Sequence, residues 1–401
     1  MSRWGALLGG TLVALVLVPA AYAARAVSVG YDSAAALRGL NVLTRVAPLH
    51  VAEVATTDVA ALRKRPGIRW VEPTFARHHL GGTVDVVSTG VVGAEWEFAA
   101  TRSNLVPASV QQAAARITIA VIDTGADLAA PDIAAKNPIT YNAVTGTNFV
   151  SDTTGHGTFV ASLAAGAITL GNAMRGFGGD AKLMVVQANA DANTFNDVDE
   201  AAAIVWAVNN GAQVINLSIG GSDTSQVEED AVSYAISHGV LLVAAAGNSG
   251  LSGNVPSYPA ALLGSHGLAV AATTATGTHA SFSTEAPYIS IAAPGVQVLG
   301  ATTPAASASD FPRVAVAKAA GVYAYGTGTS YAAPQVAGAA ALVWAANPSL
   351  TSDQVVALLE QTADGTGVWN DATGYGVLDV ANAVARALGV PPPPLKIRKR
   401  Q

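Results

Sequence analysis

Four polar residues of this sequence have the types that acyl transfer requires. Two follow short apolar runs typical of buried strands, and two begin alanine-rich segments typical of buried helices; in chain order they are Asp123, His156, Asn248 and Ser330. A serine hydroxyl can attack a carbonyl carbon, an imidazole can take its proton, a carboxylate can orient the imidazole, and an amide can donate to the oxyanion. Each residue alone could be a cap or a turn residue. The coincidence of all four favours a hydrolytic site.

The segment 326–338 surrounds Ser330 with turn-forming residues before it and an apolar run after it. Gly326 and Gly328 permit positive φ angles and the close approach of another chain. We expect Ser330 in the first turn of a buried helix, where free N–H groups and the helix dipole favour a developing negative charge. The backbone N–H of Ser330 would then form part of an oxyanion hole. Taken alone, the segment is equally compatible with a helix-capping serine.

The elements that must position these residues alternate between apolar strands and helices. Strands are expected at 117–122, 182–187, 214–219, 240–246 and 268–272, and helices at 157–166, 197–210, 226–238, 352–362 and 379–388. This alternation predicts an α/β fold, a three-layer and mostly parallel sheet with helices on both faces. Ligands of such sheets bind beyond the carboxyl ends of the strands. Asp123 and Asn248 stand at such ends.

The N-terminus of the 401-residue chain has the pattern of a secretory signal peptide. Arg3 precedes an apolar run at 6–18, and Ala21-Tyr22-Ala23 forms a small-residue cleavage site. The run is short for a membrane span, which takes about 20 residues. We therefore expect cleavage after Ala23, a secreted protein of the extracellular space or cell envelope, and no transmembrane anchor beyond the signal peptide.

The charge of the chain is unevenly distributed. Residues 24–80 carry eight Lys and Arg against four Asp and Glu, whereas residues 81–390 carry eight against 23. A basic segment beside an acidic body predicts two parts that attract each other. An acidic body would repel phosphate, so we expect no nucleic-acid partner. The chain has no Cys, which excludes disulfides, thiolate metal sites and a cysteine nucleophile.

These patterns divide the chain into five parts. After the signal peptide at 1–23, residues 24–80 predict a small α+β unit, with strands near 26–29 and 68–71 and a helix that starts near Thr57. Residues 81–116 have weak patterning and are interpreted as a connector and the irregular start of the main domain. The main domain follows at 117–390, and a Pro-rich basic tail at 391–401 ends the chain.

Four motifs resemble those of the subtilisin-like serine peptidases, the subtilase family. They are Val-Ile-Asp-Thr-Gly at 121–125, Gly-His-Gly-Thr at 155–158, Ala-Gly-Asn at 246–248 and Gly-Thr-Ser-Tyr-Ala-Ala-Pro at 328–334. The similarity covers about residues 117–390, in the family's order of Asp, His, Asn and Ser. The resemblance implies a serine endopeptidase that acts on polypeptides. It implies that Ser330 is the nucleophile and His156 the general base and acid. It further implies that Asp123 is the orienting carboxylate and Asn248 the oxyanion donor.

The resemblance also implies a substrate cleft and an inhibitor. A peptide would add as a strand to an edge formed by Leu217, Ser218, Ile219 and Gly220, with an opposite wall formed by Ala245, Ala246 and Gly247. Residues 24–80 are similar to the inhibitory propeptide of the family, and we expect residues 75–80 to lie in the cleft and to be cut by Ser330. No cofactor is required. Calcium occurs in the family as a structural ion, and Asp132 resembles one ligand position, but the sequence offers no complete oxygen set.

Three other readings compete with this one. An aspartic peptidase would use Asp123-Thr124-Gly125, but that class needs two carboxylates that share a proton, and the triplet occurs once. An α/β-hydrolase esterase would need Gly-x-Ser-x-Gly and the order Ser, Asp, His. A secreted binding protein could keep the fold without activity, although no position of the triad is substituted.

Overall fold

Seven strands form a central sheet in which every neighbouring pair is parallel. The computed structural model describes residues 25–81, 95–168, 175–191, 194–316, 320–365 and 367–394, so the signal peptide and the basic residues of the tail lie outside it. The strand order is β14 (Ile291–Pro294), β13 (Gly267–Thr273), β12 (Leu241–Ala245), β10 (Val214–Leu217), β6 (Thr118–Asp123), β8 (Lys182–Gln187) and β7 (Ile139–Asn142). The expected parallel sheet is confirmed.

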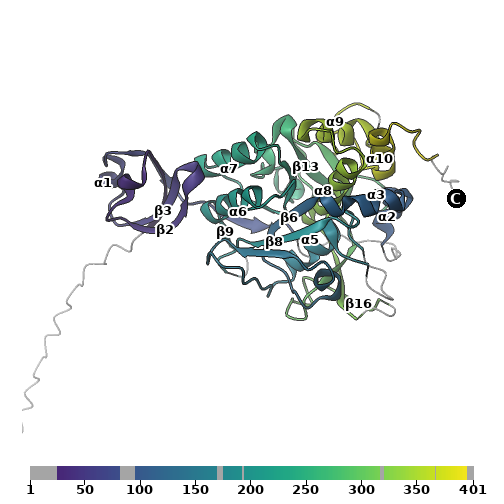
Figure 1. Cartoon of the computed structure of the whole chain (residues 1–401), viewed down its shortest axis with the longest axis horizontal. Helices are drawn as coiled ribbons and strands as arrows, with labels where there is room; N and C mark the ends of the chain where they lie inside the picture. Colours follow the sequence, from purple (N-terminus) through teal and green to yellow (C-terminus); the bar gives the residue numbers. More distant parts are fainter. Residues whose placement is uncertain are drawn as a thin grey trace, which may run out of the picture.

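Helices cover both faces of this sheet (Figure 1). Since side chains alternate along a strand, β6 sends Ile119 and Val121 into one buried cluster and Ala120 and Ile122 into the other. The first cluster lies under α5 (His156–Ala165) and α8 (Thr329–Ala346), and the second under α6 (Asp197–Asn209) and α7 (Gln226–Ser237). The three-layer prediction is thereby confirmed.

Further helices complete the main body. They are α9 (Ser352–Thr362) and α10 (Val380–Leu388), with the short helices α2 (Trp96–Ala100), α3 (Ala108–Ala113) and α4 (Pro131–Ala134). Helix α3 contacts α8, so the stretch 81–116, interpreted as a connector and the irregular start of the main domain, contributes two short helices to the main body. None of the helices in the described residues has the length and apolar character needed to cross a membrane.

Two small sheets flank the main one. One consists of β15 (Val298–Thr302), β17 (Val322–Gly326) and β16 (Arg313–Val314), and β17 leads directly into the turn before α8. The other arises because the expected strand at 214–219 is interrupted. Strand β10 ends at Leu217, and β11 (Ile219–Gly220) leaves the central sheet to pair elsewhere.

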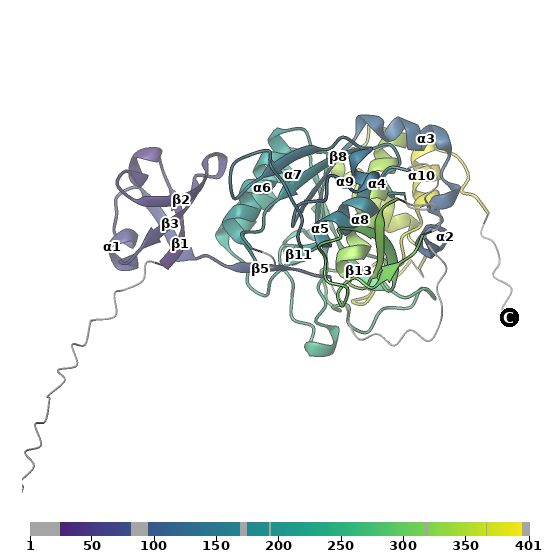
Figure 2. The same ribbon diagram turned by 90° about the horizontal axis from the view of Figure 1, so that it is seen from below.

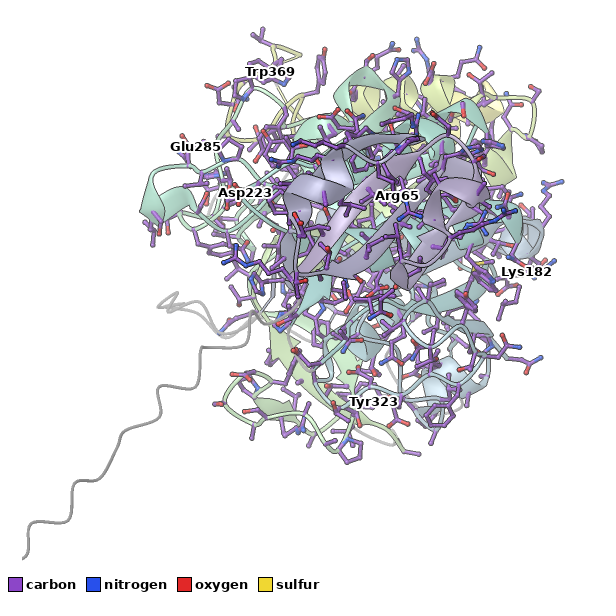
Figure 3. The ribbon with its side chains drawn as sticks, turned by 90° about the vertical axis from the view of Figure 1, so that its left-hand side faces the viewer. Arg65, Lys182, Asp223, Glu285, Tyr323 and Trp369 are labelled. Atoms are coloured by element: carbon purple, nitrogen blue, oxygen red, sulfur yellow. The ribbon has the colours of Figure 1, made fainter. Side chains whose placement is uncertain are left out.

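The N-terminal residues fold into a separate small domain. Its antiparallel sheet has the order β2 (Asn41–Val46), β3 (Val51–Thr56), β1 (Arg25–Tyr31) and β4 (Ile68–Pro73), with α1 (Val59–Arg63) beside it. Asp58 caps α1 by accepting from the Ala61 N–H at 2.8 Å. The domain lies at one end of the molecule over α6 and α7 (Figures 1 and 3). Arg65 lies on it in the face turned to the viewer of Figure 3.

A single strand connects the small domain to the cleft of the main body. Strand β5 (Ala76–His79) runs from the small domain along the main body beside β11 (Figure 2). It pairs antiparallel with β11 on one side and with β9 (Phe195–Asn196) on the other. The chain thus inserts its own segment as the middle strand of a three-stranded sheet.

Candidate active site

Asp123 and His156 are brought together by the end of β6 and the start of α5. Both side chains are buried, and His156 Nδ1 lies 2.7 Å from Asp123 Oδ1. The same carboxylate oxygen accepts from the Thr124 N–H at 2.7 Å, which fixes its orientation. Because the carboxylate can only accept, Nδ1 carries the proton and Nε2 is left as an acceptor.

Asp152 positions the helix that carries His156, a role that the sequence analysis missed. Its two carboxylate oxygens accept from the backbone N–H groups of Gly155 at 2.9 Å and Thr158 at 2.8 Å, and from the Thr158 hydroxyl at 2.6 Å. These bonds satisfy donors of the first turn of α5, which have no partner within the helix. Asp152 stands three residues before the N-cap Gly155, outside the usual capping position, so no local sequence signal identifies it.

Ser330 lies in the first turn of α8, as expected. Its hydroxyl donates to the Ser218 carbonyl at 2.9 Å, and the Ser218 hydroxyl donates back to the Ser330 carbonyl at 2.9 Å. Within the described residues His156 Nε2 has no hydrogen-bond partner. A Cβ built on Gly81 would lie 2.7 Å from Nε2, so Gly81 stands directly against the imidazole. The serine hydroxyl is thus engaged by Ser218 and not by the imidazole.

The carbonyl oxygen of Leu80 lies between the Asn248 side chain and the start of α8. It accepts from Asn248 Nδ2 at 2.6 Å and from the Ser330 N–H at 3.3 Å. The Asn248 amide is held in this orientation because its Oδ1 accepts from the Thr329 N–H at 3.0 Å and the Thr329 hydroxyl at 2.9 Å. A Cβ on Gly328 would lie 2.5 Å from the Leu80 oxygen. The close approach expected at this glycine is therefore the approach of the residue 80–81 peptide bond.

The expected substrate edge holds the segment that ends at Leu80. The Leu80 N–H donates to the Ser218 carbonyl at 3.1 Å, and Ile219 and Gly220 pair with His79 and His78 of β5. Gly220 leaves room for the Leu80 side chain, because a Cβ there would lie 2.9 Å from Leu80 Cδ1. Leu217, the buried last residue of β10, anchors this edge to the central sheet.

The residues expected to form the opposite wall are buried behind the site. Ala245 ends β12 inside the main core. The Ala246 carbonyl accepts from the Tyr288 hydroxyl at 2.8 Å, and the Gly247 N–H donates to the Thr329 hydroxyl at 3.3 Å. The second bond ties the chain before Asn248 to α8, and so holds the Asn248 side chain near the Ser330 N–H.

Asp132, the residue that resembles a calcium ligand position, is engaged by a tyrosine. Asp132 is buried in α4, and its Oδ2 accepts from the Tyr323 hydroxyl at 2.7 Å. Across the described part of the chain, no group of three or more His, Cys, Asp or Glu side chains is arranged to hold a metal ion. Calcium prefers six to eight oxygen ligands, and Asp132 instead serves as an acceptor for a tyrosine.

The small domain contacts the main body mainly through apolar side chains and hydrogen bonds. Val46 and Val51 belong to the buried cluster under α6 and α7. Glu72 accepts from the Val227 N–H at 3.4 Å at the start of α7. Among the described residues, the ion pairs that join the N-terminal segment to the body involve Arg77 of β5. The attraction expected from net charge is thus concentrated, at short range, in one side chain.

The sequence of this chain is similar to those of known peptidases. Residues 114–376 match the family model described as the subtilase family, Peptidase_S8. An alkaline protease of Alkalihalobacillus alcalophilus is 33% identical over 325 residues, which are 80% of this chain and 76% of that protein. Subtilisin Savinase of Lederbergia lenta is 37% identical over 254 residues, 63% of this chain and 86% of that protein.

Solved structures share the fold. Fervidolysin from Fervidobacterium pennivorans, described as a keratinolytic enzyme related to subtilisin, aligns with a TM-score of 0.75 at 26% identity. The alignment covers 93% of this chain and 62% of that one. The epidermin leader peptide processing protease of Staphylococcus aureus aligns with a TM-score of 0.71 at 22% identity, over 91% of this chain and 99% of that one.

Proposed function

Because the chain belongs to the subtilase family of serine peptidases, we propose that it is a secreted endopeptidase that matures by cutting itself between Leu80 and Gly81. The observation that carries the proposal is the Leu80 carbonyl, which accepts from Asn248 Nδ2 and the Ser330 N–H beside the imidazole of His156. A peptide carbonyl bound by two converging donors next to a serine hydroxyl has the geometry of a substrate.

In the proposed reaction, Ser330 Oγ attacks the carbonyl carbon while His156 Nε2 takes its proton. Asp123 holds the ring through Nδ1 and stabilises the imidazolium. The tetrahedral oxyanion receives the hydrogen bonds of Asn248 Nδ2 and the Ser330 N–H. His156 then protonates the leaving nitrogen, which is the Gly81 nitrogen in self-cleavage. Water attacks the acyl-enzyme by the same route and releases the new carboxylate.

Residues 24–80 are proposed to inhibit the enzyme after this cut. The segment before Leu80 pairs with β11 and β9, and the small domain packs on α6 and α7. These contacts do not involve the Leu80–Gly81 bond, so they persist once it is cleaved. The cleft then stays blocked by its own product until the small domain leaves. Polypeptide substrates would bind along the same edge.

A serine-directed phosphonylating reagent tests the enzymatic proposal. The processed protein should lose casein hydrolysis in step with the label, and peptide mapping should locate the label on Ser330. A catalytically silent binding protein would neither hydrolyse casein nor take up the label. An aspartic peptidase would hydrolyse casein without reacting, but Asp123 is paired with an imidazole, and a carboxylate dyad is required for that class.

A further inference from the structure

Arg77 occupies a defined subsite of the cleft. Since Leu80 supplies the carbonyl of the cleaved bond, Arg77 is the fourth residue on the acyl side. Its side chain is completely buried, although it comes from the segment that the enzyme releases. Gly221 leaves room for it, because a Cβ there would lie 3.1 Å from both Cδ and Nη1 of Arg77.

Two buried carboxylates from different helices face this guanidinium. Arg77 Nε donates to Glu228 Oε1 of α7 at 2.8 Å and lies 3.6 Å from Glu200 Oε2 of α6. Both glutamate side chains are fully buried. Asp197, one turn before Glu200, adds negative charge near Arg77 and accepts from the Phe75 N–H at 3.3 Å.

In the described part of the main body, no other cation forms an ion pair with these acids. Glu200 and Glu228 hydrogen-bond to each other, and among the described residues no other donor reaches the oxygens of Glu200 or Glu228 Oε2. Burial raises the pKa of both carboxyl groups, and the charge of Glu228 raises the pKa of Glu200 further. Two buried acids whose other partner is the arginine of a released segment are costly to keep. A pocket that retains two of them beside a substrate strand is built to receive a positive group from that strand.

We infer that the mature enzyme selects polypeptides with an arginine as the fourth residue on the acyl side of the cleaved bond, and that Glu200 and Glu228 recognise its side chain. This inference rests on the proposed function and names the preference of the same cleft. A guanidinium suits the site better than an ammonium. Its Nε faces both carboxylates while Nη1 donates to the Ala76 carbonyl at 3.1 Å, whereas an ammonium is a compact and more strongly hydrated charge.

The test compares quenched fluorescent peptides that span residues 75–84 on the unaltered mature enzyme. One peptide keeps the natural sequence, one carries Arg77→Ala, and one has Ala76 and Arg77 exchanged, so that its composition is unchanged and only the register differs. A hydrogen bond to a charged group contributes about 1.5–3 kcal/mol, so kcat/KM should fall about 10- to 100-fold with either altered peptide. Equal kcat/KM for all three would overturn the inference.

Enzyme variants test which residue of the cleft recognises the arginine. In Glu228→Gln the ratio of kcat/KM between the natural and Arg77→Ala peptides should shrink to less than about threefold, a coupling that a double-mutant cycle measures. Glu229→Gln removes a charge from the exposed face of the same helix and should leave the ratio unchanged. An unchanged ratio in Glu228→Gln would refute its assignment, and Glu200→Gln repeats the test should that variant not fold.

The outcomes separate the two proposals. Cleavage of all peptides at the same bond without a preference leaves the endopeptidase intact and refutes the arginine subsite. If the protein cleaves none of the peptides and its Ser330 also fails to react with the phosphonylating reagent, the proposed function is refuted, and this inference with it.

Discussion

Replacing Asn248 with Ala removes the closer of the two donors to the Leu80 oxygen. The Asn248 amide lies 2.6 Å from that oxygen and the Ser330 N–H lies 3.3 Å from it. Loss of one oxyanion donor costs about 10²–10³-fold in kcat, or about 2.7–4 kcal/mol, a value established on subtilisin, itself a member of this family. Because Asn248 supplies the shorter bond, we expect a loss near the upper end of that range.

The assay is a single turnover within one molecule. Purified precursor is refolded from denaturant, and the first-order rate of cleavage at Leu80–Gly81 is followed by intact mass. Substrate binding is intramolecular here, so the rate reports the chemical step without KM. The melting temperature of each precursor, measured in parallel, shows whether the fold is kept.

Asn248→Asp separates donation from structural support. It keeps the oxygen that accepts from Thr329 but places an acceptor where the donor stood, so cleavage should be at least as slow as in Asn248→Ala. If Asn248→Asp cleaved at close to the natural rate while Asn248→Ala did not, the residue would act by supporting Thr329. A loss smaller than about tenfold in both variants would refute the oxyanion role itself.

Three further outcomes follow from the structure. Asp123→Asn should slow self-cleavage by about 10⁴-fold, because it favours the wrong imidazole tautomer; cleavage within tenfold of the natural rate would contradict that role. Burial raises the pKa of Glu97 to about 8. As the pH rises from about 4.5 to 8, the unfolded chain therefore loses this proton before the folded chain does. The free energy of unfolding falls over that range, by up to about 5 kcal/mol. Glu97→Gln should therefore resist denaturant better than the natural protein at pH 9 and equally at pH 4, and equal midpoints at pH 9 would refute this. Added 24–80 peptide should inhibit the mature enzyme at micromolar concentration. Its association rate should fall as the salt concentration rises from 0.1 to 1 M, whereas its dissociation rate should change little because the Arg77 ion pairs are buried. Absence of inhibition would make the segment a permanent part of the fold.

The sequence was most informative where one short pattern determines one local structure. Buried parallel strands are continuous apolar runs, so β6, β8, β12 and β13 lie within about a residue or two of their predicted places. Asp123 and Asn248 could be found because strand ends at one edge of a parallel sheet converge. The break at Ser218 could not be seen, because the apolar run continues through it and only the pairing of β11 with β5 reveals it.

What the sequence could not supply were contacts between distant segments. By its place in the sequence, Glu200 is an acid in the first turn of a helix, where the helix dipole alone explains its presence. Arg77 is one of the eight basic residues in the segment 24–80. Their meeting with Glu228 depends on how α6, α7 and β5 pack, and no local pattern in the chain encodes that packing.

The most direct test of the account is the first pair of fragments that the refolded precursor produces. N-terminal sequencing and intact mass should show one fragment that ends at Leu80 and one that begins with Gly81-Gly82-Thr83. Ser330→Ala should refold with the same melting temperature and remain uncut under the same conditions. A first cut elsewhere in the natural protein, or a new N-terminus at Gly81 in purified Ser330→Ala, would contradict the account.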